Sequence, residues 1–487
     1  MKDNIRYSVI VNLIKTLVLT LLSFISFPHV CAALGAEVMG TYTWANTFVF
    51  YFLIIAKSGI PNIAIRECSK VKDDRIALSK KVQEFFIIQA IHTILAFTLM
   101  CIGVFSVKEL FEWKDLIFIL SINFLVSTFS FEWLFIALEK HYFISLRSIA
   151  TLATCSLLII SLVRRPTDLY LYSFLAILST ILNVIINVFC LKKYVTFKYV
   201  GPYEFKSYLK PIFVVFIISL MLTLYNSTDT FILGFLDKSK SQVANYSVGV
   251  KSIEIIIALI TSLDAVFIPR ATRYFKMDNK YFFNNLTRYG FNICLFIAIP
   301  AIASMSMLSH QITNIISGGS VEYQKAPIVL IILVSMSLTF SLSDMIYEQV
   351  LLPMKKEKYY LYTLLLGAVL NIGGSIYLGN IFKEYNNNPA IGVAIATMLT
   401  DIIVLINLIV VTKEYVIKAL FNKNTLKLFI GGISVLISSF IIAYIVPLNN
   451  DIVKIILTIC IGAFIYISVL VLLKEDLVYS FIRKKNK

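Results

Sequence analysis

The chain has 487 residues, of which 59% are hydrophobic and 15% charged, and its mean hydropathy is +0.84. Soluble globular domains are about 45–50% apolar, so this composition excludes an ordinary soluble protein and indicates a chain whose solvent is the bilayer. The formal net charge of +16 also occurs in nucleic-acid-binding proteins. Here the basic residues lie in short loops between apolar segments, so we expect no nucleic acid as a partner.

Apolar segments follow one another along the whole chain, and most are long enough to cross about 30 Å of hydrocarbon at about 1.5 Å per residue. We therefore predict an all-α, polytopic membrane protein with about 14 transmembrane helices. The predicted spans are 7–27, 43–65, 84–106, 115–138, 146–163, 168–191, 211–236, 243–268, 288–309, 325–347, 359–380, 390–412, 426–446 and 453–473.

The basic residues fall mainly on one side of these spans. With the N-terminus in the cytoplasm, most of the 44 lysine and arginine residues lie in the termini and in the loops that face inward. The positive-inside rule then places both termini in the cytoplasm. A signal peptide is the alternative for the first segment, because small residues surround Cys31 after it; Lys15 within the apolar run favours a retained span.

The predicted loops are all short, which leaves no room for an extramembrane nucleotide-binding or catalytic domain. The sequence has no Walker A motif, no Gly-rich phosphate loop and no paired acidic motif in a large loop. Its seven cysteines are scattered without metal-ligand or disulfide spacing. We therefore expect no cofactor, no metal site and no enzymatic activity. Any transport must draw on an ion gradient or on the gradient of the substrate itself.

Spans 1–6 and 7–12 share landmarks in register. Glu132 precedes Lys140 by eight residues at one span end, as Glu348 precedes Lys356 at another, and this pattern indicates a parallel internal repeat. We predict an N-terminal lobe at residues 1–200 with spans 1–6 and a C-terminal lobe at 201–420 with spans 7–12. Two accessory spans, 13 and 14, and a basic cytoplasmic tail then occupy residues 421–487.

Lysines inside the predicted spans are candidates for function, because a charge at mid-bilayer costs about 2.5–3.5 kcal/mol on insertion scales. Lys15 and Lys57 lie at a similar depth in the first lobe, and Lys251 lies in span 8. Their ammonium groups suit a diphosphate that must lose its water to cross. The alternative is that Lys15 and Lys57 extend toward the inner headgroups. Gly59-Ile60-Pro61, beside Lys57, is either a hinge or a plain helix end.

Acidic residues inside the second lobe are candidates for ion coupling. Asp229 and Lys251 lie at equal depth on adjacent spans, which predicts an ion pair. Such a pair either fixes packing or acts as a switch in which the lysine exchanges the carboxylate for phosphate. Glu254 shares a helix face with Lys251, and Asp401 lies near mid-span. Buried carboxylates can load protons, so both are coupling candidates, with simple pairing to a lysine as the alternative.

Several runs of residues resemble a known family. They are LGAEVMGTYTWANTF (34–48), SGIPNIAIRECSK (58–70), EWLFIALEKHYFISLRS (132–148), LKPIFVVF (209–216), NSTDTFILGF (226–235), NYSVGVKSIE (245–254) and VFIPRAT (266–272). With them the chain resembles the polysaccharide-transporter branch of the multidrug/oligosaccharidyl-lipid/polysaccharide exporter superfamily, which contains the Wzx-type O-antigen and capsule flippases. The resemblance covers nearly the whole chain and is weakest in the last two spans.

This resemblance implies two six-helix lobes around a central cavity that opens alternately to the two sides of the bacterial cytoplasmic membrane. It also implies a flippase rather than an enzyme. The cargo of such a flippase is an undecaprenyl-diphosphate-linked oligosaccharide, moved from the inner to the outer leaflet for lipopolysaccharide O-antigen or capsule biosynthesis. A polysaccharide polymerase and other assembly proteins are the partners that the resemblance implies.

Glycan recognition would use dispersed polar and aromatic side chains. The candidate contacts are Tyr42, Trp44, Asn46, Tyr225 and Asn226. For the aromatic residues the alternative is an anchor at the membrane interface.

Three other functions remain open. A multidrug or metabolite exporter of the same superfamily typically has twelve spans and prefers an acidic cavity for organic cations. A lipid II flippase shares the fourteen spans. A membrane-embedded polysaccharide polymerase or glycosyltransferase would need a large external loop. The span count and the cationic residues of the first lobe disfavour the exporter, and the short loops disfavour the enzyme. The runs quoted above look closer to the polysaccharide group than to the lipid II flippases.

Overall fold

The computed structural model describes residues 2–448 and 450–479, without the side chains of 2–14, 265 and 266. These residues form helices and no strand, and 13 of the described helices are long and apolar enough to cross a membrane. The predicted all-α polytopic membrane protein is therefore confirmed. The chain forms two compact units, Met1–Ser227 and Thr228–Lys487. The lobe boundary at residue 200 stays a prediction.

The first unit is built from nine α-helices and one 3₁₀ turn within its described residues. They are α1 (Lys2–Lys57), α2 (Ile60–Lys70), α3 (Arg75–Ser106), α4 (Lys108–Glu112), α5 (Lys114–Ser127), α6 (Glu132–Ala137), α7 (His141–Leu162), η1 (Pro166–Asp168), α8 (Leu169–Leu191) and α9 (Lys206–Leu236), of which α9 continues into the second unit.

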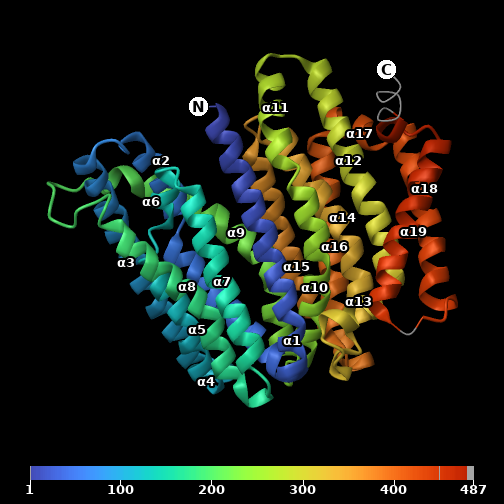
Figure 1. The fold of residues 1–487 in the computed structure, drawn as a ribbon, viewed down its shortest axis with the longest axis horizontal. Coiled ribbons are helices and arrows are strands. Elements are labelled where there is room, and N and C mark those ends of the chain that lie inside the picture. Colours follow the sequence, from blue (N-terminus) through green and yellow to red (C-terminus); the bar gives the residue numbers. More distant parts are fainter. Residues whose placement is uncertain (1, 449, 480–487) are drawn as a thin grey trace. The chain divides into compact units, whose positions relative to one another are not determined.

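Helix α1 contains two predicted spans. As a straight rod its 56 residues would be about 84 Å long, far more than one bilayer crossing requires. It is broken at Gly35, whose φ of 76° and ψ of 170° suit a residue without a Cβ. Helix α1 starts at the N-terminus and passes through the opposite end of its unit, and α2, which follows it, lies back at the N-terminal end (Figure 1). The predicted loop at 28–42 is therefore a sharp turn at one glycine, and α1 supplies two crossings.

The chain also breaks where α1 meets α2. Ser58 and Gly59 have left-handed φ values of 41° and 69°, and Pro61 lies in the first turn of α2. Gly59 approaches α9 closely, because a Cβ added there would lie 2.5 Å from Cγ1 of Val215. The helix break expected at Gly59-Ile60-Pro61 is present, and its role as a hinge stays a prediction.

The packing of the first unit centres on α1, which contacts α3, α5 and α7, while α8 packs on α5 and α7. An apolar cluster joins α2, α3, α6 and the start of α9 at the end of the unit where α2 lies. Its largest fully buried members include Phe85 and Leu78. Since this cluster surrounds the break after Lys57, it fixes the position of the residues on either side of that break.

The second unit contains the remaining helices of the described chain. They are α10 (Ser241–Thr261), α11 (Asp264–Lys276), α12 (Lys280–Met307), α13 (Ser309–Ile316), the 3₁₀ turn η2 (Val321–Tyr323), α14 (Ala326–Ile346), the π-helix η3 (Tyr347–Leu351), α15 (Glu357–Asn386), α16 (Pro389–Val411), α17 (Lys413–Leu420), α18 (Lys423–Phe440), the π-helix η4 (Ile441–Ile445) and α19 (Asp451–Leu472).

Small residues allow close helix packing in this unit. A Cβ added to Gly392 of α16 would lie 2.3 Å from the carbonyl oxygen of Leu378 in α15, so the two backbones touch there, as is common between membrane helices. Helix α18 approaches α12 in a similar way, because a Cβ on Gly432 would lie 2.2 Å from Cγ2 of Ile299. Helices α18 and α19, the predicted accessory spans, thus pack on α12 and on each other (Figure 1).

Candidate functional site

Asp229 of α9 is a buried carboxylate at the meeting point of three helices in the second unit. Only 4% of the residue is exposed. Its Oδ2 accepts a hydrogen bond from the hydroxyl of Tyr246 in α10 at 2.7 Å and another from Oγ1 of Thr397 in α16 at 3.0 Å. Its other oxygen, Oδ1, is buried without a hydrogen-bond partner. A charged group this deep needs compensation, and the two hydrogen bonds to it fall on one oxygen.

A polar network extends from this carboxylate into α15. Nδ2 of Asn371 donates to Oγ1 of Thr397 at 3.3 Å, and the hydroxyl of Ser375 donates to Oδ1 of Asn371 at 3.2 Å. Asp401 lies one turn beyond Thr397 on α16 and therefore on the same face. It is 1% exposed and near enough to Tyr246 to act on it electrostatically. Four helices thus direct hydroxyl, amide and carboxylate oxygens toward one buried region.

This chemistry suits a small monovalent ion or a proton. Carboxylate, hydroxyl and amide oxygens are hard ligands of the kind that alkali and alkaline-earth cations take. In the part of the chain that the structure describes, no group of three or more His, Cys, Asp or Glu side chains could hold a metal ion. Binding of one positive charge at Asp229 would neutralise the carboxylate on which α9, α10 and α16 converge.

The predicted ion pair between Asp229 and Lys251 is not formed. Lys251 bonds to Glu254 at 2.6 Å, whereas Asp229 bonds to Tyr246 and Thr397. Equal depth did not fix the direction in which the side chains point. Lys251 follows Tyr246 by five residues, or about 140° around the helix at 3.6 residues per turn, so Tyr246 and Lys251 face different sides. Glu254, about 60° from Lys251, lies within its reach.

In the first unit, Arg147 pairs with Glu132, and Lys57 lies near the same carboxylate at the break after α1. Glu132, at the start of α6, lies 3.5 Å from Nη2 of Arg147 in α7 (Oε2–Nη2) and also acts electrostatically on Lys57 at the end of α1. The side chain of Arg147 is 2% exposed and that of Glu132 is 40% exposed. The cluster of Lys57, Glu132 and Arg147 therefore carries a net positive charge, with its carboxylate on the accessible side.

Arg147 is held firmly in this cluster. Its Nη1 donates to Oδ1 of Asn187 in α8, and Nδ2 of Asn187 donates to the carbonyl of Ser130 before α6. Its guanidinium also lies 5.8 Å from the ring centroid of Phe143, within cation–π range. Its Nε is buried without a hydrogen-bond partner.

The remaining predicted residues are spread over the first unit. Lys15 is partly exposed on α1, and no described residue forms an ion pair with it. Trp44 is fully buried and Tyr225 is 7% exposed, so these two side chains lie inside the packed helices. The ring of Tyr42 contacts that of Tyr172 at a tilt of 56°, with ring centroids 4.6 Å apart.

Of the other two predicted glycan contacts, Asn46 is partly exposed and Asn226 is exposed. These two asparagines are therefore the accessible members of that set. The roles of all five in glycan binding stay predictions.

Four residues of these two sites were missed by sequence reasoning. Tyr246, Asn371 and Thr397 are polar but uncharged, and Arg147 lay at the edge of a predicted span, where a basic residue is ordinary. The available signal was the presence of hydrogen-bonding side chains in otherwise apolar helices, since such groups need partners in the bilayer. That signal says nothing about which helices they face.

An apolar groove runs between α12, α18 and α19 and reaches α10 and α13. It encloses about 470 Å³. Phe296 and Pro300 of α12 line one side and Gly462 and Tyr466 of α19 the other, and the lining is almost entirely apolar. Because α12 and α19 are membrane-spanning, the groove lies at the depth of the lipid tails and suits a hydrocarbon chain.

The fold is similar to those of two solved transporters. The lipid II flippase MurJ in an inward closed conformation matches with a TM-score of 0.73 and 19% identity over 96% of this chain and 99% of that one. An inward-facing multidrug resistance MATE family transporter of the MOP superfamily matches with a TM-score of 0.61 and 13% identity over 82% and 96%. At these identities the similarity concerns the fold alone.

Sequence comparison gives the family. No curated protein matches the chain, but the model of the family described as "Polysaccharide biosynthesis protein" matches residues 5–275, more than half of the 487 residues. The resemblance predicted from the residue runs is thereby confirmed, and the chain belongs to the polysaccharide biosynthesis protein family.

Proposed function

We propose that this chain is a flippase that moves an undecaprenyl-diphosphate-linked oligosaccharide from the inner to the outer leaflet of the bacterial cytoplasmic membrane. The cargo serves O-antigen, lipopolysaccharide or capsule biosynthesis, and a polymerase and other assembly proteins receive it. The family and the transporter fold support this function. The step is translocation by alternating access, without chemical change of the cargo, so the protein is not an enzyme.

The observation that carries the proposal is the apolar groove between α12, α18 and α19. A cargo with a long polyprenyl chain must keep that chain among apolar groups while its headgroup crosses. The groove, with about 470 Å³ and an almost wholly apolar lining, supports a role as the track for part of that chain. Exporters of small water-soluble compounds have no such need, which favours a lipid-linked cargo.

The charged clusters support two further parts of the proposal, which are binding of the diphosphate and binding of a coupling ion. Lys57 and Arg147 beside Glu132 provide cations for the diphosphate, which would replace the carboxylate as their partner. Asp229, with its open Oδ1, provides a place for the coupling ion. Lys15 and Lys251 remain further candidates for the diphosphate, and Glu254 and Asp401 for coupling.

The fold similarity to MurJ favours lipid II as the alternative cargo, and the similarity to a multidrug transporter keeps drug export as a second alternative. Deletion of the gene in its host separates them, with lipid-linked intermediates and surface glycan analysed. The proposal predicts accumulation of undecaprenyl-linked oligosaccharide on the cytoplasmic face and loss of surface glycan, both restored by the intact gene. Normal glycan with altered drug sensitivity, or accumulated lipid II, would contradict it.

A further inference from the structure

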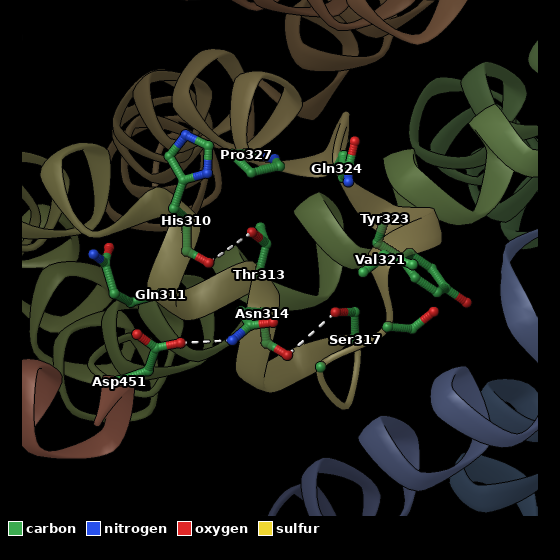
Figure 2. Close-up of a pocket in the computed structure, with 12 residues that line it drawn as sticks. His310, Gln311, Thr313, Asn314, Ser317, Val321, Tyr323, Gln324, Pro327 and Asp451 are labelled. Carbon is green, nitrogen blue, oxygen red and sulfur yellow. Dashed lines mark hydrogen bonds between the residues drawn. The ribbon is translucent and has the colours of Figure 1, made fainter. Parts of the chain in front are cut away.

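A polar pocket lies at the end of the second unit where α12 ends and α14 begins (Figure 2). Its walls come from α13, from the loop between α13 and η2, from the start of α14 and from Asp451 at the start of α19. Its volume is about 270 Å³. That is room for a single small ring.

The lining of this pocket is polar but nearly uncharged. Apart from Gly319, Val321 and Pro327, every lining residue carries a hydroxyl, amide, imidazole or carboxylate group. Asp451 is the acidic member, and the lining holds no lysine or arginine. A phosphate would find no cation here, and one carboxylate is too few for a divalent cation, which takes six or more oxygen ligands. The chemistry fits an uncharged molecule with many hydroxyl groups.

The polar groups of the pocket are fixed in place by hydrogen bonds. Nδ2 of Asn314 donates to Oδ2 of Asp451 at 2.6 Å, and the hydroxyl of Ser317 donates to the carbonyl of Asn314 at 3.2 Å. Both contacts are visible in Figure 2. The hydroxyl of Thr313 donates to the carbonyl of Ser309 at 2.7 Å, so its direction is fixed as well. Sites of fixed donors and acceptors lose little entropy when a ligand binds.

The loop that closes the pocket is shaped by two left-handed glycines. Gly318 and Gly319 have φ values of 66° and 78°, which glycine adopts without steric cost. Their amides donate to the carbonyls of Ile315 and Asn314 at 3.1 and 2.8 Å. The chain therefore turns back directly after α13, and η2 is brought against the pocket with Gln324 at its rim.

We infer that this pocket binds a single neutral sugar ring. The positive-inside rule places this end of the unit on the outer face of the membrane, where a translocated glycan emerges. The natural occupant is then a sugar of the transported oligosaccharide, and this assignment rests on the proposed function. A free sugar shares the same chemistry, and the experiment separates the two sources.

The test measures sugar binding to the purified full-length chain by saturation-transfer NMR. The probes are glucose, galactose and N-acetylglucosamine at millimolar concentration, and the lipid-free oligosaccharide released by mild acid from the lipid-linked precursor of the host. The variant Gln324→Trp fills the pocket from its exposed rim, and Asn314→Ala removes a donor. Asn386→Trp places the same large ring at an exposed position at the end of α15, outside the lining, and serves as the control.

The inference predicts binding to the wild type and to Asn386→Trp, loss of binding in Gln324→Trp, and at least tenfold weaker binding in Asn314→Ala. If the host oligosaccharide binds more tightly than the monosaccharides, the natural ligand is a sugar of the transported glycan. If both bind equally, the natural ligand is a free sugar. No binding to the wild type, or unchanged binding in Gln324→Trp, overturns the inference.

A wild-type chain that restores surface glycan in the deletion strain but binds no sugar overturns the inference alone. A chain that binds sugar but restores no glycan overturns the proposed function alone.

Discussion

Thr397 on α16 donates a hydrogen bond to Asp229 on α9, 168 residues earlier in the chain, with an Oγ1–Oδ2 distance of 3.0 Å. Tyr246 on α10 donates to the same oxygen at 2.7 Å. Three helices are therefore tied to one carboxylate oxygen, while the second oxygen is buried without a hydrogen-bond partner. A ligand that binds this carboxylate in one conformation better than in another shifts the balance between the two conformations. Under the proposed function, a coupling ion bound at Asp229 would shift the conformation of the second unit in this way.

Asp229→Asn is predicted to remove ion coupling. The amide keeps the size of the side chain but can neither take up a proton at this site nor balance a bound cation. Transport in proteoliposomes should then no longer respond to an imposed proton or sodium gradient. Glu139→Gln is the control, because the Glu139 side chain is 62% exposed and pairs with Lys72 outside the membrane-spanning helices. Retained gradient dependence in Asp229→Asn would show that the coupling ion binds elsewhere.

Lys57→Ala is predicted to lower glycan export, because it removes one of the two cations beside Glu132. A lost charged hydrogen bond to the diphosphate is worth about 1.5–3 kcal/mol, which corresponds to a fall of roughly tenfold or more. Lys57→Arg should keep most of the export. Surface glycan in a complemented deletion strain is the measurement.

The control for this prediction is Lys72→Ala. Lys72 lies in a loop, and the hydrogen bond from its Nζ to Glu139 at 2.8 Å lowers the pKa of the Glu139 carboxyl. The two side chains are 37% and 62% exposed and already pair with each other, so export should not change. Full export in Lys57→Ala would remove Lys57 from the account of diphosphate binding.

Gly392→Ala is predicted to destabilise the second unit. The added Cβ would meet the backbone of Leu378 at 2.3 Å, and overpacking of this kind costs about 1–3 kcal/mol. Gly373→Ala on α15 is the matched control, since nothing lies within 4 Å of its added Cβ and alanine favours a helix. Thermal unfolding in detergent, measured by size-exclusion chromatography, should therefore give a lower midpoint temperature for Gly392→Ala than for the wild type. The midpoint temperature of Gly373→Ala should not fall. Equal midpoints would disprove the close contact of α15 and α16.

Gly462→Leu is predicted to lower transport without unfolding the protein. Its Cβ would meet Val435 at 3.5 Å, an ordinary contact, and the rest of the leucine would occupy the apolar groove that Gly462 lines. Gly373→Leu adds the same side chain in open space and should transport normally. If both variants transport equally well, the groove does not hold the cargo chain during translocation.

Much of the fold follows directly from hydrophobic segment length. The spans of α3, α7, α8, α12 and α16 lie where runs of about 20 apolar residues predict them, because length and apolarity are properties of each segment alone. The turn at Gly35 was not predictable in that way. The span ending at residue 27 predicted a loop from 28 onward, yet the helix continues past Pro28, and the chain turns at the glycine that adopts a φ of 76°.

The sites were less predictable, because they depend on which faces of distant helices meet. Asp229 stood out as a charge in a span, but its partners Tyr246 and Thr397 come from two other helices, and depth alone suggested Lys251 instead. Arg147 was hidden because basic residues are common at inner span ends. Its contact with Glu132 depends on how α6 and α7 pack against each other, which the sequence does not show.

The most direct test of the central claim is a flipping assay with the purified chain in proteoliposomes. The inner leaflet carries an undecaprenyl-diphosphate-linked oligosaccharide from the host, and an added glycan-cleaving or lectin reagent detects what reaches the outer leaflet. The account predicts that the oligosaccharide appears outside at a rate that depends on the chain and falls in Lys57→Ala. If the chain moves lipid II or a drug but leaves the oligosaccharide inside, the account is wrong.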